Sequence, residues 1–563
     1  MLLAMVACNI DKVITDEAEC PEISFDNPSG VYSLKVGERL TLTPSVRNAE
    51  EALYTWLLEG EVVGSEPAYT FHAKEEGRFY LLFRVEARGG KAEQEVRLDV
   101  HAPKLPTIAF LTDGEGAISV AANTPTRIAP AIGNDTNARY RWTLNGEQVG
   151  SERTYLFCQS EVGDYTLTLQ VHNDEGEASA TLTVRVVKRL AAKLYLPTPS
   201  HPEGSPATAI SLGQSLHLCP FTEQMSDPDF EWNIGGQVCG TERVFCYTPT
   251  QEGIETLRCQ ATDTNGESLA ATIEVRCCAP EASHLRPITS ASSPHATRVL
   301  AYTPAPGQFI NEGGLQASTP EEATTLAEKI LRENTSQGNA RYLSLGAWGG
   351  ALVVGFDHSV RNGAGADFSI TGNHFNESSE PGVVYLMQDS NENGLADEVW
   401  YEVRGSESGK TTTLSDYAIT YHRPQGARQS VLWRDNRGQM GEIPVNAYHK
   451  QESYYPAWIE AERYTLYGTR LPAKTYQDAS GNYINEAYAW GYADNAGSDA
   501  APESDAENRG KVYFDISNAQ HADGTPVSLQ YIDFVRVQSA IYHIAPIIGE
   551  NSTEIFALTD EQY

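Results

Sequence analysis

The eleven residues Tyr54-Thr55-Trp56-Leu57-Leu58-Glu59-Gly60-Glu61-Val62-Val63-Gly64 belong to a pattern that occurs three times in the chain. The second copy reads YRWTLNGEQVG at residues 140–150, and the third reads FEWNIGGQVCG at residues 230–240. The aromatic residue, the Trp and both Gly keep the same spacing, and each Trp is followed by Glu after ten residues and Gly after twenty-one. Such self-similarity at a nearly constant period indicates tandem copies of one domain.

Each repeat is predicted to be all-β. Segments such as 40–42 and 80–85 alternate apolar and polar side chains, and Asn145-Gly146 is typical of a tight hairpin turn. About 85 residues with seven short strands around a central Trp indicate a two-sheet sandwich of immunoglobulin type. We expect a signal remnant and tether at 1–24, repeats at 25–102, 103–188 and 189–280, a linker at 281–295, and a C-terminal domain at 296–563.

The repeats resemble the PKD-like immunoglobulin-type repeats of bacterial surface proteins. The resemblance rests on Trp-x3-Gly, on Gly-x-Tyr/Phe before an alternating strand, and on Asn-Asp-Glu-Gly or Thr-Asn-Gly before the last strand. It implies that the repeats act mainly as spacers, with glycan or protein binding by one of them as the alternative. The Trp at a core position of a strand favours core packing and a stalk.

Composition excludes one class of partner. The 563 residues carry a formal charge of -34, and a field of that sign repels phosphate backbones, so no nucleic-acid binding is expected. No stretch of 18 apolar residues offers a membrane-spanning helix.

The amino terminus resembles the end of a bacterial lipoprotein signal peptide. An apolar segment ends in Ala7, the next residue is Cys8, and acidic residues follow. The resemblance implies that Cys8 is lipidated and that the protein is anchored to the outer membrane at the cell surface; an ordinary hydrophobic strand is the alternative. In the third repeat, Cys219 and Cys259 flank Trp232, and an inter-sheet disulfide between them is one pairing that their positions would allow.

The second half is predicted to be a large β-sandwich or jelly-roll-like domain with one short helix. Segments 351–356, 383–387, 399–403 and 531–537 have strand character. The helix is expected at about 320–334, with Thr319 as its N-cap and Glu322 three residues later.

One loop has the spacing of a calcium site. Asp389, Asn391, Asn393 and Asp397 place oxygen side chains at positions 1, 3, 5 and 9, Gly394 occupies position 6, and Leu395 would offer its carbonyl. Position 12 is Trp400, so Glu398 or Glu402 would have to supply the missing carboxylate. We predict a structural Ca²⁺ ion held by Asp389, Asn391, Asn393, Leu395, Asp397 and Glu398; a hairpin loop without an ion is the alternative.

Segments around this loop, among them 365–375, 491–495 and 532–537, resemble the C-terminal domain of PKD-bearing cell surface proteins of Bacteroidetes. The resemblance implies a lipoprotein that accompanies a TonB-dependent transporter in nutrient uptake, with a glycan or corrinoid as cargo. Asp367, Asn373 and Glu380 are candidates for a second ion site, with turn capping as the equal alternative.

Aromatic residues provide the expected ligand surface. Tyr and Trp offer flat contacts that suit sugar rings or a planar macrocycle. The candidates are Tyr454, Tyr455, Trp458, Tyr488 and Trp490, although core packing accounts for many aromatics in this region.

Catalytic templates are missing: the chain has no GxSxG, HExxH, P-loop or GxGxxG motif after a strand. The favoured hypothesis is therefore a surface lipoprotein that binds a nutrient. The alternatives are an adhesin or scaffold that binds proteins and, less favoured, a glycan-active enzyme.

Overall fold

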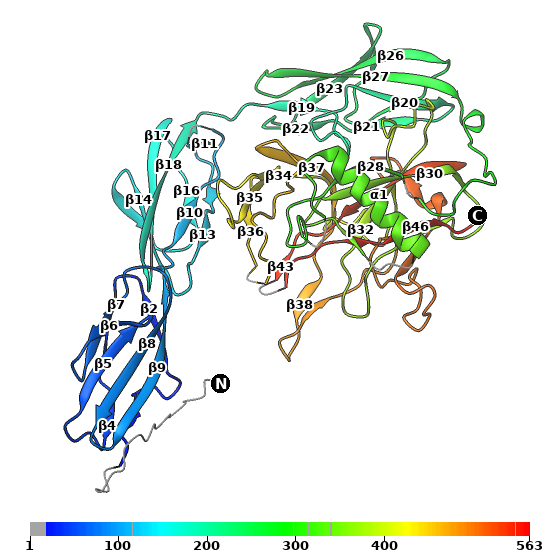
Figure 1. Ribbon diagram of the computed structural model, residues 1–563. Helices are drawn as coiled ribbons and strands as arrows, with labels where there is room; N and C mark the ends of the chain where they lie inside the picture. The colour runs from blue at the N-terminus through cyan, green and yellow to red at the C-terminus, as the bar shows by residue number, and fades with distance from the viewer. Residues whose placement is uncertain are drawn as a thin grey trace. The chain divides into compact units, whose positions relative to one another are not determined.

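The computed structural model describes residues 19–114, 116–296, 298–312, 315–337, 341–446, 448–545 and 548–563. The chain forms two compact units. The first holds the first repeat together with segments 134–139 and 171–178, and the second holds the remainder. The molecule is mainly β, as expected, with tandem sandwiches followed by a large β domain that carries one α-helix among the described residues (Figure 1).

Each repeat contains a five-stranded sheet with the same strand order. The first strand runs parallel to its neighbour and the other pairings are antiparallel where their register is described. In the first repeat the order is β2 (Val31–Lys35), β9 (Gly90–His101), β8 (Gly77–Ala87), β5 (Leu53–Leu58) and β6 (Glu61–Gly64). In the second it is β11 (Ala117–Ala121), β18 (Gly176–Val187), β17 (Gly163–Asn173), β14 (Arg139–Leu144) and β15 (Glu147–Gly150). In the third it is β20 (Ala207–Leu212), β27 (Ser268–Pro280), β26 (Gly253–Thr262), β23 (Asp229–Ile234) and β24 (Gln237–Gly240).

Short strand pairs accompany each of these sheets. The first repeat has β1 (Glu22–Ser24) with β4 (Ser45–Arg47) and β3 (Arg39–Leu42) with β7 (Tyr69–His72). The second has β10 (Thr107–Ala109) with β13 (Ala131–Gly133) and β12 (Thr126–Ile128) with β16 (Tyr155–Phe157). The third has β19 (Lys193–Tyr195) with β22 (Phe221–Glu223) and β21 (Leu216–Leu218) with β25 (Phe245–Tyr247).

The repeated sequence pattern has a common structural cause. The indoles of Trp56, Trp142 and Trp232 are fully buried, and each ring nitrogen donates to the carbonyl of the Glu ten residues later, at 2.8–2.9 Å. Each indole stacks on an aromatic ring thirteen residues later, with centroids 5.0–5.7 Å apart. The Gly eight residues after each Trp lies under that ring, where a Cβ would come within 2.9–3.3 Å of it. The pattern therefore encodes core packing, as predicted.

The C-terminal domain is built on a six-stranded sheet. Its order is β28 (Arg298–Thr303), β30 (Ala351–Arg361), β42 (Tyr531–Ser539), β32 (Gly382–Met387), β33 (Tyr401–Val403) and β41 (Ala519–Gln520). Every residue of β32 and β42 is buried, and alternate side chains join two different apolar clusters. Both faces of the sheet are therefore covered at β32, which explains why this strand reads as a continuous apolar run.

Smaller sheets complete the domain. One contains β36 (Met440–Ile443), β35 (Val431–Asp435), β34 (Leu414–His422) and β37 (Arg463–Arg470), and another contains β40 (Lys511–Phe514), β31 (Phe368–Thr371) and β46 (Ala557–Asp560). The two-stranded pairs are β29 (Leu343–Ser344) with β45 (Glu554–Ile555), β38 (Thr475–Gln477) with β39 (Tyr483–Asn485), and β43 (Ile544–Ala545) with β44 (Gly549–Glu550).

The α-helix, α1 (Pro320–Gln337), packs beside β28 and β46 (Figure 1). The backbone N–H of Glu322 donates to Thr319 Oγ1 at 3.2 Å, which confirms the expected N-cap, and the Glu322 carboxylate accepts from the backbone of Ser318. The helix buries one face in the main core of the C-terminal domain, through Ala323, Ala327, Ile330 and Leu331. No helix among the described residues has the length and apolar character needed to cross a membrane.

Candidate functional site

The third repeat and the C-terminal domain meet within the second compact unit through specific polar contacts. Trp400 donates its indole N–H to Ser200 Oγ at 2.8 Å, and the hydroxyl groups of Ser211 and Ser390 lie 3.1 Å apart. The rings of His217 and His521 stack with centroids 3.8 Å apart. These contacts hold the two domains on either side of a cavity.

The cavity has a volume of about 650 Å³. That lies within the ~300–1,000 Å³ range of small-molecule sites, which often form between domains. Apolar, aromatic and polar side chains of both domains line the cavity. The third repeat contributes Leu196, Pro197, His217 and Arg243, and the C-terminal domain contributes Tyr385, Trp400, Glu402, Tyr467, Thr469, Gln520 and His521.

Glu402 is one of the acidic residues of this wall. It lies in the middle of the short strand β33, where neighbours Tyr401 and Val403 are buried in the core, so its own side chain points to the opposite face. Burial raises the pKa of Glu402 to about 7, although hydrogen bonds from Thr469 and Gln520 oppose the shift. Near neutral pH this carboxyl group therefore exchanges between a form that donates and a form that only accepts hydrogen bonds.

The stacked imidazoles form the second polar feature. His217 Nδ1 lies 2.9 Å from the Asp523 carboxylate, and its Nε2 lies 3.3 Å from Cys246 Sγ. Burial, with the neighbouring His217 as a second cause, lowers the pKa of His521 to about 4. His521 is therefore neutral at pH 7, and its Nδ1 is buried without a hydrogen-bond partner in the described part of the chain.

The predicted calcium loop forms part of the same wall, because residues 396–400 line the cavity. The loop closes as the spacing requires: Asp389 Oδ2 accepts the N–H of Gly394 at 3.1 Å, and Gly394 has a φ of 71°. The side-chain oxygens of Asn391 and Asn393 accept the N–H groups two residues later, at 3.0 and 2.7 Å.

The donor set of this loop fits a hard cation. Asp389 Oδ1 and Glu398 Oε2 are buried without a hydrogen-bond partner, so each has an oxygen free for an ion. Burial, with the nearby Asp397 and Asp389 as further causes, raises the pKa of Glu398 to about 9. The Asp397 carboxylate instead accepts from the amides of Asn391 and Asn393 at 3.1 and 3.0 Å. The Ca²⁺ ion stays a prediction, and its residues would be Asp389, Asn391, Asn393, Leu395, Asp397 and Glu398.

The expected aromatic surface is wrong for four of its five residues. Tyr454, Tyr455, Trp458 and Tyr488 are at most 2% exposed, because their rings pack in the cores of the C-terminal domain. Trp490 is partly exposed and lines a separate cavity of about 160 Å³. Aromatic density in this region therefore reflects packing.

The expected disulfide is also wrong, because Cys219 and Cys259 are both free thiols. Cys259 lies in β26 opposite Trp232 and is fully buried in the repeat core. Cys219 follows β21 and lines the cavity instead, so it does not face its expected partner. Cys8, the expected lipidation site, lies outside the described residues.

Sequence reasoning considered Glu402 only as a calcium ligand and missed the histidine pair. The two histidines are far apart in the sequence, and no local motif surrounds either of them. A signal for Glu402 did exist: a charged residue between the apolar residues of a short strand has to find a polar environment on the other face.

Comparison with known proteins assigns the first two repeats. Residues 20–87 and 106–173 match the model of the PKD-like domain, so the chain contains PKD-like domains of β-sandwich fold. No curated protein sequence matches the chain.

Three solved structures are similar to part of this chain. The I-band fragment I67–I69 of titin is 15% identical and covers 46% of this chain and 99% of its own, with a TM-score of 0.23. Immunoglobulin domains 1–4 of Sidekick-1 are 13% identical and cover 48% and 76%, with a TM-score of 0.18. Fibronectin(III)-like modules of Clostridium thermocellum CbhA are 14% identical and cover 30% and 97%, with a TM-score of 0.18. These TM-scores support no inference about function.

Proposed function

We propose that the protein is a surface or secreted binding protein in which PKD-like repeats carry a C-terminal β domain, and that the cavity between the third repeat and this domain captures a small nutrient. The observation that supports this proposal is the ~650 Å³ cavity in which polar side chains of two domains converge between aromatic walls.

The chemistry of the wall favours a neutral, hydroxyl-rich ligand such as a short glycan. Glu402, Gln520 and neutral His521 supply donors and acceptors, while Trp400 and Tyr467 supply flat apolar area for a sugar face. Charged groups of both signs line the cavity, so no strongly charged ligand is favoured. An intact corrinoid, the other expected cargo, is larger than the drug-sized ligands that cavities of this volume bury.

The cellular setting follows from the resemblances of the sequence. We infer that Cys8 anchors the protein by a lipid to the outer membrane of a Gram-negative bacterium and that the captured glycan passes to a TonB-dependent transporter. The predicted Ca²⁺ ion at the 389–398 loop would hold the wall that includes Trp400 in its binding position.

An adhesin is the second candidate, and the edge strands of the repeats favour it. β6, β15 and β24 each end a five-stranded sheet. Each exposes an apolar side chain: Val62 is 68% exposed, Val149 38% and Val238 58%. Exposed apolar edge strands are surfaces to which a partner strand can add.

A ligand screen with a cavity-filling variant tests the proposal. The full chain is screened by thermal shift and native mass spectrometry against neutral oligosaccharides and cobalamin, and mass analysis of the released ligand shows whether it remains intact. Ser415, an exposed residue that lines the cavity, is replaced in Ser415→Trp, and exposed Ser480 of the hairpin 475–485 provides the control Ser480→Trp.

The proposal expects binding of an oligosaccharide by wild type and by Ser480→Trp, with at least tenfold weaker binding by Ser415→Trp. Equal binding by both variants would place the ligand elsewhere. A shortened glycan would identify an enzyme instead of a binding protein.

A further inference from the structure

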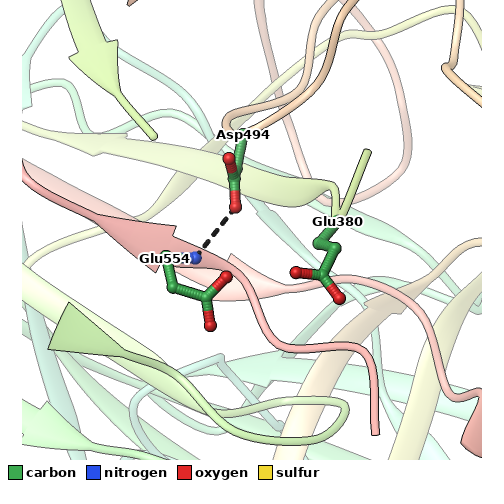
Figure 2. Close-up of side chains that lie close together, drawn as sticks. All are labelled: Glu380, Asp494 and Glu554. Carbon is green, nitrogen blue, oxygen red and sulfur yellow. Dashed lines mark hydrogen bonds between the residues drawn. The ribbon is translucent and has the colours of Figure 1, made fainter. Parts of the chain in front are cut away.

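Three carboxylates from distant parts of the sequence meet inside the C-terminal domain (Figure 2). Glu380 lies two residues before β32, Asp494 lies in the loop after residue 490, and Glu554 begins β45. One oxygen of each lies within 4.8 Å of the others. Among the described residues, no other three His, Cys, Asp or Glu side chains meet in this way.

Backbone groups hold Asp494 rigidly. Its Oδ1 accepts the N–H groups of Asn373 and His374, both at 2.8 Å. Its Oδ2 accepts the N–H of Glu554 at 2.9 Å, which is the dashed line in Figure 2. The residue has a φ of 52°, and a Cβ at position 372 would lie only 2.3 Å from Asp494 Oδ1, so Gly372 leaves the room that this carboxylate needs. A strained conformation kept in place by so many contacts is typical of a functional position.

The other two carboxylates of the cluster, those of Glu380 and Glu554, also have defined surroundings. Glu380 Oε1 accepts from the Asn551 amide at 3.2 Å and from the backbone of Ser552 at 3.4 Å. The backbone N–H of Glu380 also donates to the Asp494 carbonyl at 3.0 Å, which ties the two loops together. Glu554 is 2% exposed, and its Oε1 has no hydrogen-bond partner in the described chain.

Within the described part of the chain, no lysine or arginine compensates the charge of this cluster. No Lys or Arg of the described residues forms an ion pair with any of the three carboxylates. Three carboxylates brought together away from water repel one another, and such a group requires either protons or a cation to compensate it.

His374 provides an independent indication that this cluster binds a ligand. It is 7% exposed, and its Nδ1 lies 3.7 Å from Asp494 Oδ1, beyond hydrogen-bonding distance. This nitrogen is buried without any hydrogen-bond partner in the described residues. A buried polar atom directed at a carboxylate cluster and left unpaired indicates that an ion or an ordered water belongs between them.

We propose that Glu380, Asp494 and Glu554 bind a hard divalent cation, of which Ca²⁺ is the best match, with His374 facing a water in its coordination shell. Carboxylate oxygens are the ligands that Ca²⁺ prefers, and waters complete the six to eight positions that three side chains leave open. The partly exposed Glu380 gives the ion its way in. By joining segments 380, 494 and 554, the ion acts as a cross-link of the domain.

The test uses the full chain and removes the other predicted ion site. Asp389→Asn with Asp397→Asn disables the 389–398 loop, and this background protein is stripped with EDTA and titrated with Ca²⁺, Mg²⁺ and Mn²⁺ by calorimetry and thermal shift. Glu380→Gln and Glu554→Gln are added separately, and exposed Glu486→Gln is the matched control.

The proposal expects one bound Ca²⁺ in the background protein and in the Glu486→Gln control, with a rise of ~5 °C in the unfolding midpoint at 100-fold excess over Kd. Glu380→Gln and Glu554→Gln should each weaken binding at least tenfold. If Glu554→Gln does not fold, Glu380→Gln and anomalous scattering from Mn²⁺ in crystals decide the question. No cation binding in the folded background protein, or Mn²⁺ located elsewhere, would overturn the proposal and leave a carboxyl pair that shares a proton.

Discussion

Replacing Glu402 by Gln should stabilise the protein at alkaline pH. Burial raises the pKa of Glu402 from 4.5 to about 7. Between pH 4.5 and pH 7, the folded protein therefore keeps a proton on Glu402 that the unfolded chain has already released. Stability contributed by this group is complete below pH 4.5 and is lost as the pH rises to 7. The rise of the pKa from 4.5 to about 7 corresponds to at most ~3.4 kcal/mol, at ~1.36 kcal/mol per pKa unit. Glu402 is partly exposed, so solvent screening reduces this to ~2 kcal/mol.

The assay compares urea unfolding of the wild type and Glu402→Gln at pH 5 and pH 8, followed by the fluorescence of the C-terminal Trp residues. Other buried acids, such as Glu550, contribute equally to both proteins, so they cancel in the difference. We expect the variant to be ~2 kcal/mol more stable at pH 8 and nearly equal at pH 5, while exposed Glu486→Gln changes nothing. A variant less stable than wild type at pH 8 would refute the reasoning, because it would show that the folded protein stabilises the ionised carboxylate.

Three further predictions concern the repeats and the loop. Trp232→Ala should destabilise the third repeat by ~3–5 kcal/mol in urea unfolding, since it removes a fully buried indole and its hydrogen bond; a loss below 1 kcal/mol would contradict the packing described. Maleimide labelling of the denatured, unreduced protein should modify both Cys219 and Cys259, whereas a disulfide-linked peptide pair would show that the thiols are not free. EDTA should lower the unfolding midpoint of the wild type, and Asp389→Asn should remove one Ca²⁺ per chain in native mass spectrometry; an unchanged ion count would exclude the loop.

The tandem sandwiches could be predicted from the sequence because their signals are local. The Trp, the stacked aromatic and the Gly beneath it lie within fourteen residues, so their spacing records a contact that the fold repeats three times. The same holds for the N-cap at Thr319, which depends on residues three apart. Short-range geometry of this kind is visible without knowledge of the tertiary structure.

The candidate sites depend on contacts between residues that lie far apart in the sequence, so local patterns do not reveal them. Tyr454 and Trp458 lie in a segment rich in aromatic residues that the sequence predicted as a ligand surface, yet the cores of the C-terminal domain bury them. Of the residues expected at a second ion site, Asp367 caps turns by accepting the N–H groups of Gly363 and Ile516, both at 2.7 Å. Glu380 lies in the carboxylate cluster for which we propose an ion, and ion binding there stays a prediction. The partners of Glu380 lie more than 100 residues away, so only the fold could identify them.

Hydrogen–deuterium exchange of the full chain with and without a saturating oligosaccharide tests ligand capture by the interdomain cavity most directly. The account predicts slower exchange in the cavity wall, at residues 196–201, 396–404, 467–469 and 520–523, with no change in the edge strands. Protection confined to residues 61–64, 147–150 or 237–240 would contradict it and support an adhesin that binds through its repeats.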